Sequence, residues 1–562
     1  MAQDTPVPLA RNGPVRYKQT EGSAQVMAAA RRRRPRQDRL PPSPQRAPAA
    51  PGLRVFSIPL ALTAALLLVS LVARVQESAI LTGSFWAAAA GLLLWHTGLV
   101  LRLRTRRANR AFHVVLRPQH YLQATLHISV FAYWGYFWGP VYDHVWLLVG
   151  QLLFAYAFDM LLSWSRRERY GLGFGPFPII FSTNLFLWFR DDWFYLQFLM
   201  IAVGFLGKEF VRWHRDGRST HIFNPSAFSL GLFSLVLIAT DSSNLTWGDQ
   251  IATTLNLAPN PYLFLFILGL IVMYFFSITL VSACAAAALF GLSALYTSVT
   301  GVPFFHDAEI PIAVFLGLHL LVTDPSTSPR TATGKAMFGV LYGLCVFGLY
   351  ELLGSFGIPT FYDKLLGVPL LNLCVPAIDQ AARALRRTDE PQPGGLEVIP
   401  RRANLAFMAV WILFFGAMAA RGGATDGKHT GDSVPFWQEA CALDQRNACR
   451  TLALVEVVYC TDGSGWACNE IGLHYTQGFD VLEPDPEYAA AWFSRACELG
   501  FQPGCTNQRS PEELHRDNPS ISDLRFLLRE GRQNLRAMPA AALRARACNH
   551  GWTFACGDGT TP

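Results

Sequence analysis

Residues 262–299 read YLFLFILGLIVMYFFSITLVSACAAAALFGLSALYTSV and contain no charged residue. Because a membrane-spanning helix needs about 20 apolar residues, this stretch is long enough for two such helices, at 262–280 and 282–299. The whole chain is 51% hydrophobic and only 15% charged, whereas soluble chains carry about a quarter charged residues. The composition therefore excludes an ordinary soluble protein and predicts a membrane protein.

Further apolar runs lie on both sides of this stretch. Runs long enough to span the membrane lie at 55–74, 83–102, 120–138, 142–163, 193–212, 221–240, 335–355 and 404–421, and shorter or interrupted runs lie at 176–189, 310–323 and 362–378. Together they predict about 13 crossings, with re-entrant or broken helices at the short runs. The fold class is therefore expected to be all-α, with a polytopic bundle of about 10–13 membrane helices.

Basic residues predict the orientation of this bundle. Residues 1–54 hold 11 basic and 3 acidic residues and no apolar period, which indicates a disordered basic segment on the cytoplasmic side. Binding of nucleic acid or anionic lipid is the alternative reading of its arginine run. Basic residues recur in alternate loops, at Arg102, Arg104, Arg106, Arg107, Arg110, Arg117, Arg166, Arg167, Arg169, Lys208, Arg212, Arg215, Arg218, Arg330, Lys335, Arg383, Arg386, Arg387, Arg401 and Arg402. Thirteen crossings from a cytoplasmic N-terminus leave the C-terminus outside, in the periplasm if this is a bacterial inner-membrane protein.

Cysteines in the last 122 residues support the same orientation. They form four pairs of identical C-x7-C spacing: Cys441 with Cys449, Cys460 with Cys468, Cys497 with Cys505, and Cys548 with Cys556. Repeated spacing of this kind predicts four local disulfides and an oxidising compartment. Zinc ligands are usually closer together, so no metal site is expected.

The chain is thus expected to have four parts. They are a disordered basic segment at 1–54, a membrane domain at 55–421, a linker at 422–434 and an extracytoplasmic cysteine-rich domain at 435–562. In the last part, residues 488–499 have helical spacing, and Ser510, Pro511 and Glu513 are typical of a helix start. The 37 positions from Cys460 to Cys497 are close to the period of a helix–turn–helix repeat, which predicts a disulfide-stapled α-solenoid, and the longer interval from Cys497 to Cys548 indicates an inserted or degenerate helix pair.

Residues 435–560 resemble cysteine-rich Sel-type repeats, relatives of the tetratricopeptide repeat, most clearly over 470–505, which end in ACELGFQPGC. In that family each C-x7-C bridge ties the end of one helix to the start of the next. The resemblance implies a domain that binds a protein partner. A module that only adds stability is the alternative.

Two phrases in the membrane domain place polar residues beside proline at a helix end. They are HIFNPSAFSLG at 221–231 and TDPSTSPRTATGK at 323–335. Free backbone groups at such ends can hold an anion, a polar ring or an ion. Asn224-Pro225-Ser226 and Asp324-Pro325-Ser326 suggest a weak internal repeat with a site at its interface, although each phrase alone is typical of a proline-terminated helix.

These phrases also carry a family resemblance. With LRPQHYLQ at 116–123, STNLFLWFRDDW at 182–193 and Gly207-Lys208, they make residues 112–385 resemble the Rnf-D/Nqr-B membrane family, whose members belong to the Rnf complex and to the sodium-pumping NADH:quinone reductase. The resemblance implies a flavin-binding electron-transport subunit, coupled to cation movement. Other membrane electron-transport subunits would be its partners, so it would be a component of an oxidoreductase and not an enzyme on its own.

The flavin of that family is usually FMN, esterified through its phosphate to a threonine in an outer loop. The outer loop expected here, 241–261, contains DQIATTL, so Thr253 is the candidate attachment residue and Thr254 a lesser one. The loop lacks the glycine and serine of the family's motif. A second site, for a flavin such as riboflavin or for an ion, would be formed near the cytoplasm by Lys208, His221, Asn224, Pro225, Ser226, Thr323, Asp324, Pro325 and Ser326. The alternative function is a non-redox transport protein or assembly scaffold that keeps the fold without flavin.

Overall fold

The computed structural model describes residues 56–517 and Ala541 and Ala545, with gaps at 106–109, 116–117, 216–217, 307, 387–398, 422–428, 430, 432–433, 462 and 481. The predicted basic segment 1–54 lies outside the described residues, as do Cys548 and Cys556. The predicted linker is described only at His429, Gly431 and Val434. Nearly all described elements are helices, so the all-α prediction is confirmed.

The elements before residue 225 are α2 (Ser57–Val69), α3 (Ala73–Gln76), α4 (Ala79–Thr105), β1 (Ala111–Val114), α5 (Pro118–Phe137), α6 (Pro140–Asp143), α7 (Val145–Arg166), β2 (Arg169–Leu172), α8 (Pro176–Asn184), η2 (Asp191–Trp193), α9 (Tyr195–Phe210), β3 (Arg212–Arg215) and β4 (Arg218–His221). The rest of the membrane domain comprises α10 (Pro225–Ala239), η3 (Ser243–Leu245), α11 (Gly248–Thr254), η4 (Leu255–Leu257), α12 (Pro261–Phe276), α13 (Thr279–Thr300), α14 (Ile312–Leu320), α15 (Ala332–Ser355), η5 (Thr360–Tyr362), α16 (Asp363–Arg386) and α17 (Arg401–Ala420). The strands form only two small sheets, a parallel pair β1–β2 and an antiparallel hairpin β3–β4.

The chain is a multi-pass membrane protein. Among the described residues, six helices are long and apolar enough to cross a membrane: Ala79–Thr105, Pro140–Arg166, Thr279–Thr300, Ala332–Ser355, Thr360–Leu385 and Arg401–Ala420. Three shorter apolar helices, α2, α10 and α12, accompany them. The apolar runs therefore predict the helices well, although the number of crossings and the side of each terminus stay predictions.

The three short runs have different outcomes. Those at 176–189 and 310–323 form the nine-residue helices α8 and α14, each followed by non-helical chain. The run at 362–378, predicted to be interrupted, instead belongs to the 24-residue helix α16. Its Pro369 packs against Gly231 of α10, where a Cβ would lie 2.7 Å from the proline ring. The absence of a side chain at Gly231 thus lets α10 and α16 approach closely.

The membrane domain contains an internal repeat of five helices. The order of a helix of 16 or 20 residues, a 22-residue helix, a nine-residue helix and two further helices occurs first in α5, α7, α8, α9 and α10, and again in α12 to α16. The two units meet where α10 packs against α16. Asn224 precedes the fifth helix of the first unit, whereas Asp324 follows the third helix of the second. The two quoted phrases are therefore not equivalent positions of the repeat.

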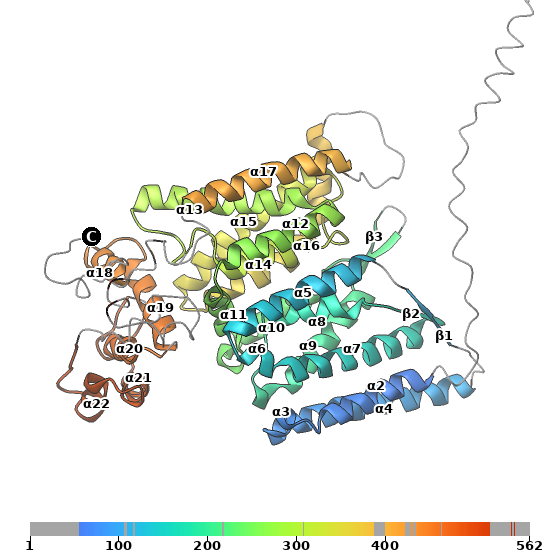
Figure 1. Ribbon diagram of the computed structural model, residues 1–562, viewed down its shortest axis with the longest axis horizontal. Coiled ribbons are helices and arrows are strands. Elements are labelled where there is room, and N and C mark those ends of the chain that lie inside the picture. Colours follow the sequence, from blue (N-terminus) through green and yellow to red (C-terminus); the bar gives the residue numbers. More distant parts are fainter. Residues whose placement is uncertain are drawn as a thin grey trace, which may run out of the picture. The chain divides into compact units, whose positions relative to one another are not determined.

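The bundle has two distinct ends. Figure 1 shows α3, α6 and α11 at one end of the roughly parallel helices, and β1, β2 and β3 at the other. The second end contains the basic residues in the last turns of α4, α7 and α9, among them Arg102, Arg166 and Lys208. Because basic segments mark the cytoplasmic side, α11 is expected to face the outside.

The tail is a helical domain held by three disulfides. Its helices are α18 (Val434–Ala442), α19 (Ala448–Thr461), α20 (Gly465–Gln477), α21 (Pro486–Glu498) and α22 (Gln502–Arg509). Cys441–Cys449, Cys460–Cys468 and Cys497–Cys505 each tie the end of one helix to the start of the next. Three of the four predicted pairs are therefore confirmed.

The predicted helix start at Ser510 is wrong. Residues 511–517 form a turn and then chain without regular secondary structure, and no helix begins at Pro511. The physical reason lies in His515, whose backbone N–H and C=O both bond to the side chain of Asn507 and so cannot serve a helix. Local sequence chemistry favoured a helix, and a tertiary contact overrode it.

Polar contacts join the tail to α15. Near the C-terminal end of that helix, Glu351 accepts hydrogen bonds from Asn447 at 3.2 Å and from Arg450 at 3.1 Å. The same helix end leads to η5, where Tyr362 donates to Ser243 at 2.9 Å, one short turn before α11. The tail and α11 therefore lie at the same end of the bundle.

Candidate functional site

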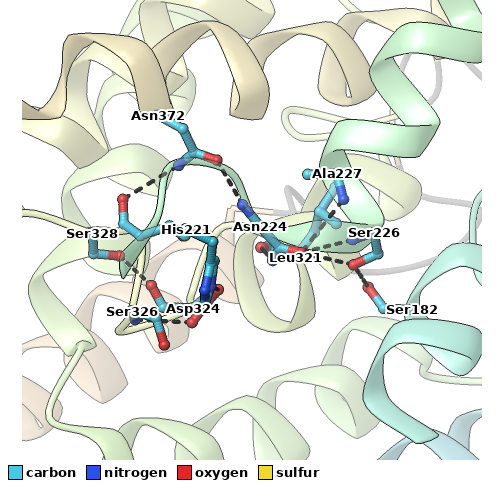
Figure 2. Close-up of polar contacts among 11 residues, drawn as sticks. Ser182, His221, Asn224, Ser226, Ala227, Leu321, Asp324, Ser326, Ser328 and Asn372 are labelled. Carbon is cyan, nitrogen blue, oxygen red and sulfur yellow. Dashed lines mark hydrogen bonds and ion pairs between the residues drawn. The ribbon is translucent and has the colours of Figure 1, made fainter. Parts of the chain in front are cut away.

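Asn224, in the first of the two quoted phrases, caps the start of α10 (Figure 2). Its Oδ1 accepts from the backbone N–H groups of Ser226 at 3.1 Å and Ala227 at 3.4 Å, and from the Ser226 hydroxyl at 2.8 Å. Its Nδ2 donates to the carbonyl of Leu321, just past α14, at 3.1 Å. One buried side chain thus satisfies the start of one helix and the end of another.

Two more segments complete this Asn224 cluster. The Asn224 N–H donates to Oδ1 of Asn372 on α16 at 3.1 Å, and Asn372 in turn donates to the carbonyl of Thr327. The Ser226 hydroxyl also lies within hydrogen-bond distance of that of Ser182 on α8, at 3.2 Å. The cluster therefore joins α8, α10, the chain after α14, and α16, at the interface of the two repeat units (Figure 2).

Asp324 and His221 lie at the edge of the Asn224 cluster. His221 Nε2 lies 4.0 Å from Asp324 Oδ2, and each side chain is about one-fifth exposed. Asp324 also accepts from the Ser326 N–H at 2.9 Å, while Pro325 and Ser326 are exposed. These are the residues of the second predicted site that a ligand could reach.

The remaining residues of that predicted site have other roles. The Thr323 hydroxyl is buried and donates to the carbonyl of His319, one turn earlier. Lys208 lies on α9, next to the ring of Phe205, and interacts electrostatically with Asp159, which accepts a hydrogen bond from Tyr170. The structure thus brings together the residues of the two phrases but assigns Lys208 to a different cluster.

The candidate attachment residue Thr253 lies on α11, at the opposite end from the basic segments (Figure 1). Its side chain is half-buried, and its hydroxyl donates to the carbonyls of Asp249 at 3.1 Å and Gln250 at 3.3 Å. The hydroxyl of Thr254 is buried; it donates to Gln250 and accepts from the indole of Trp134 at 3.3 Å. Only Thr253 therefore presents a hydroxyl that a reagent could reach.

An aromatic cluster leads inward from α11. The rings of Trp134, Trp138 and Trp188 lie 5.1–5.6 Å apart, and Trp188 stacks on the His144 imidazole at 4.1 Å. Trp134 contacts Thr254 as described. Closely spaced rings thus run from α11 to the start of α7.

Behind these rings lies a buried polar network that the sequence reasoning missed. The Asn184 Oδ1 accepts from Gln151 at 3.2 Å and Gln197 at 3.3 Å and contacts His144 at 3.2 Å. Asn184 itself donates to Gln151 at 2.7 Å. The signal was present, since each of these amides interrupts an apolar run, where a polar group is costly.

A cavity of about 310 Å³ opens beside the aromatic cluster. Trp188, Trp247 and His144 line it together with the charged groups of Arg74, Glu77, Asp143 and Asp191. Arg74 and Asp191 face each other in a bidentate ion pair at 2.8 and 2.9 Å. Trp247 also precedes α11, so the cavity and the candidate threonine share one segment.

These features are compatible with a flavin at the α11 end. An accessible hydroxyl could carry a phosphate ester, and aromatic walls with a few polar groups suit a planar ring. The Asn224 cluster is less suitable, because its amide and hydroxyl groups already bond to one another. Of the two predicted cofactor regions, the α11 end therefore has the better chemistry.

Comparison with known proteins gives one partial match. Over 94 residues, or 16% of this chain, the sequence is 37% identical to the D subunit of the ion-translocating oxidoreductase complex of Actinobacillus succinogenes. The matched stretch covers 24% of that relative, so the chain spans about a quarter of the protein it matches. No family model matches the chain. No solved structure matches it either.

Proposed function

We propose that this chain is a flavin-binding electron-transport subunit of a bacterial inner-membrane complex, coupled to cation movement. The observation that carries the proposal is the position of the half-buried Thr253 on α11, where its neighbour Thr254 contacts Trp134, the first ring of an aromatic cluster that leads into the bundle. The partial similarity to one subunit of an ion-translocating oxidoreductase complex supports the same role and implies other membrane subunits as partners.

In this proposal FMN is esterified to Thr253, and a bound flavin supplies one- and two-electron chemistry. The chain's own residues hold and surround it. Trp134 fixes Thr254 and so the last turn of α11, while the cavity lined by Trp188, Trp247 and Arg74 offers both apolar walls and a cation. His221 and Asp324 would form a separate, non-covalent site for a flavin such as riboflavin or for an ion.

The tail is proposed to be a periplasmic Sel-type repeat domain that binds a protein partner. Its support is the arrangement of three helix junctions, each closed by a disulfide of the same spacing. Disulfides persist in oxidising compartments, and the tail contacts the end of the bundle opposite the basic segments. Both observations favour a periplasmic position for the tail and α11.

A matched pair of threonine variants tests the flavin proposal. The protein is expressed together with a flavin transferase, purified, denatured on a gel and examined for flavin fluorescence. Thr253→Val should abolish the fluorescence, because it removes the accessible hydroxyl, whereas Thr254→Val should retain it. Equal fluorescence in both variants would contradict attachment at Thr253.

A non-redox transport protein or scaffold is the second candidate. The observation that favours it is the Asn224 cluster, which joins four segments. Its polar groups hydrogen-bond to one another and are therefore not available to a cofactor. The absence of both covalent and non-covalent flavin from the purified wild-type protein would decide for this candidate.

A further inference from the structure

The non-helical segment after α22 lies against the tail's own helices, at Asn507 and Asn469. Asn507 of α22 bonds to both backbone groups of His515, donating to its carbonyl at 2.7 Å and accepting from its N–H at 2.5 Å. Asn469 of α20 donates to the same carbonyl at 3.2 Å and accepts from Asn507 at 2.8 Å. Two fully buried asparagines thus bind the backbone of one non-helical residue.

Side-chain contacts flank this backbone anchor on both sides. Leu514 packs against the small cluster of Leu473, Ala489 and Phe493. On the other side, Arg516 Nε donates to Oε2 of Glu470 at 3.0 Å. The His515 side chain between them is exposed. The groove therefore recognises an apolar residue, the backbone of the next residue, and a basic residue after it.

Glu470 is not satisfied by this internal segment. Its carboxylate is almost completely buried, yet Oε1 has no hydrogen-bond partner among the described residues. Arg516, by contrast, leaves 61% of its side chain exposed. Burial, and after it the charge of Glu456, raises the pKa of Glu470 to about 8, although Arg516 lowers it. A cation that covered both carboxylate oxygens would therefore interact more favourably than Arg516 does.

We propose that the groove between α20 and α22 binds an extended segment of a partner protein, with an apolar residue two positions before an arginine or lysine. Residues 513–516 of this chain occupy that groove as an internal competitor. This inference rests on the proposed role of the tail as a protein-binding domain but is independent of flavin. It adds the chemistry of the bound segment and a reason for the unsatisfied carboxylate.

Peptide binding to the full-length protein in detergent tests the inference. The probe is a fluorescein-labelled peptide with the sequence of residues 511–517, and binding is followed by fluorescence polarisation. The variant Leu514→Ser with Arg516→Ser weakens the internal competitor, so it should bind the peptide about tenfold more tightly than the wild type. Since Arg516 is exposed, Arg516→Ser alone provides a second variant that should fold and should also bind more tightly.

Changes in the peptide and in the groove test each contact. A peptide with Arg516→Ser, or with a methylated His515 amide, should bind about tenfold more weakly, whereas His515→Ala should change little. In the protein, Glu470→Gln should weaken binding about tenfold, and Glu487→Gln, on the exposed side of α21, should not. The experiments with altered peptides use a protein whose groove residues are unchanged. They therefore still test the inference if a groove variant misfolds.

Two results would overturn the inference. One is no binding to either competitor-weakened variant at about 1 mM peptide. The other is binding that is indifferent both to the peptide arginine and to Glu470, which would mean that residues 511–517 are simply a fixed part of the fold. Flavin fluorescence of the same preparations reports separately on the electron-transport proposal.

Discussion

The membrane domain and the tail hold their helices together in opposite ways. At the Asn224 cluster, hydrogen bonds join residues that are 44, 97 and 148 positions apart in the chain. In the tail, every described disulfide joins cysteines only eight positions apart. Links between residues that are close in sequence can be predicted from their spacing. Links between distant segments can be identified only in the folded structure.

The largest effect on stability is expected from the loss of the hydrogen bonds that join distant segments at Asn224. Asn224→Ala removes three hydrogen bonds to the start of α10 and one to the end of α14. Buried groups left without partners cost about 1–3 kcal/mol each, so the total loss should be on the order of 4 kcal/mol. Thermal unfolding of the detergent-solubilised protein should show it.

Ser326→Ala is the matched control for this prediction. Ser326 is exposed, and alanine retains its backbone N–H bond to Asp324 and loses only the hydroxyl contact with the same carboxylate. If Asn224→Ala unfolds at the same temperature as this control, the Asn224 cluster does not hold the repeat units together.

A smaller loss of stability is expected when one of the local disulfides of the tail is removed. Replacing Cys460 and Cys468 by serine opens one short loop between α19 and α20 and should destabilise the tail by about 2–3 kcal/mol. The membrane domain should unfold as before. Protease resistance of the tail, followed beside the unfolding of the bundle, separates the two. A parallel loss of stability in both domains would show that the tail is not an independently closed unit.

The change in the stability of the tail with pH should be smaller than the loss caused by removing a disulfide. Burial raises the pKa of Glu470 to about 8, above its value of about 4.3 in an unfolded chain. Folding therefore favours the protonated carboxyl, and this contribution, on the order of 2 kcal/mol, is complete below pH 4 and is lost as the pH rises through 8.

Glu470→Gln provides the comparison, since glutamine cannot ionise. Between pH 6 and 9 the wild-type tail should lose stability relative to the variant, as measured by thermal unfolding at each pH. A constant difference over that range would show that Glu470 does not titrate there.

The smallest effect should come from the exposed edge of the Asn224 cluster. Asp324→Asn weakens a partly exposed contact of 4.0 Å with His221, so stability should change by less than about 1 kcal/mol. In-gel flavin fluorescence should be unchanged, because Thr253 lies at the other end of the bundle. Reduced non-covalent flavin or electron flow would support a second site at His221, and lost fluorescence would contradict the separation of the two.

The sequence predicted the parts of the molecule that depend on local chemistry. Apolar length located the helices, from α2 to α17, and cysteine spacing gave three described disulfides. It also indicated Asn224 as a polar residue at a helix end, which the structure shows to be the cap of α10.

The rest depends on contacts between distant segments. Asn372 and Ser182 join the Asn224 cluster although nothing in their local sequence indicates it. The amides Gln151, Asn184 and Gln197 meet only because α7, α8 and α9 pack together. At Ser510 a locally favourable helix start lost to the asparagine contacts of His515.

The central claim, that flavin is attached to α11, is tested most directly by peptide mapping of the wild-type protein. The protein is co-expressed with a flavin transferase, digested, and analysed by mass spectrometry. We expect the peptide containing Thr253 to carry the mass of an esterified FMN and fragmentation to assign it to Thr253. An unmodified peptide in protein that received adequate flavin and transferase, or a flavin on another residue, would contradict the claim.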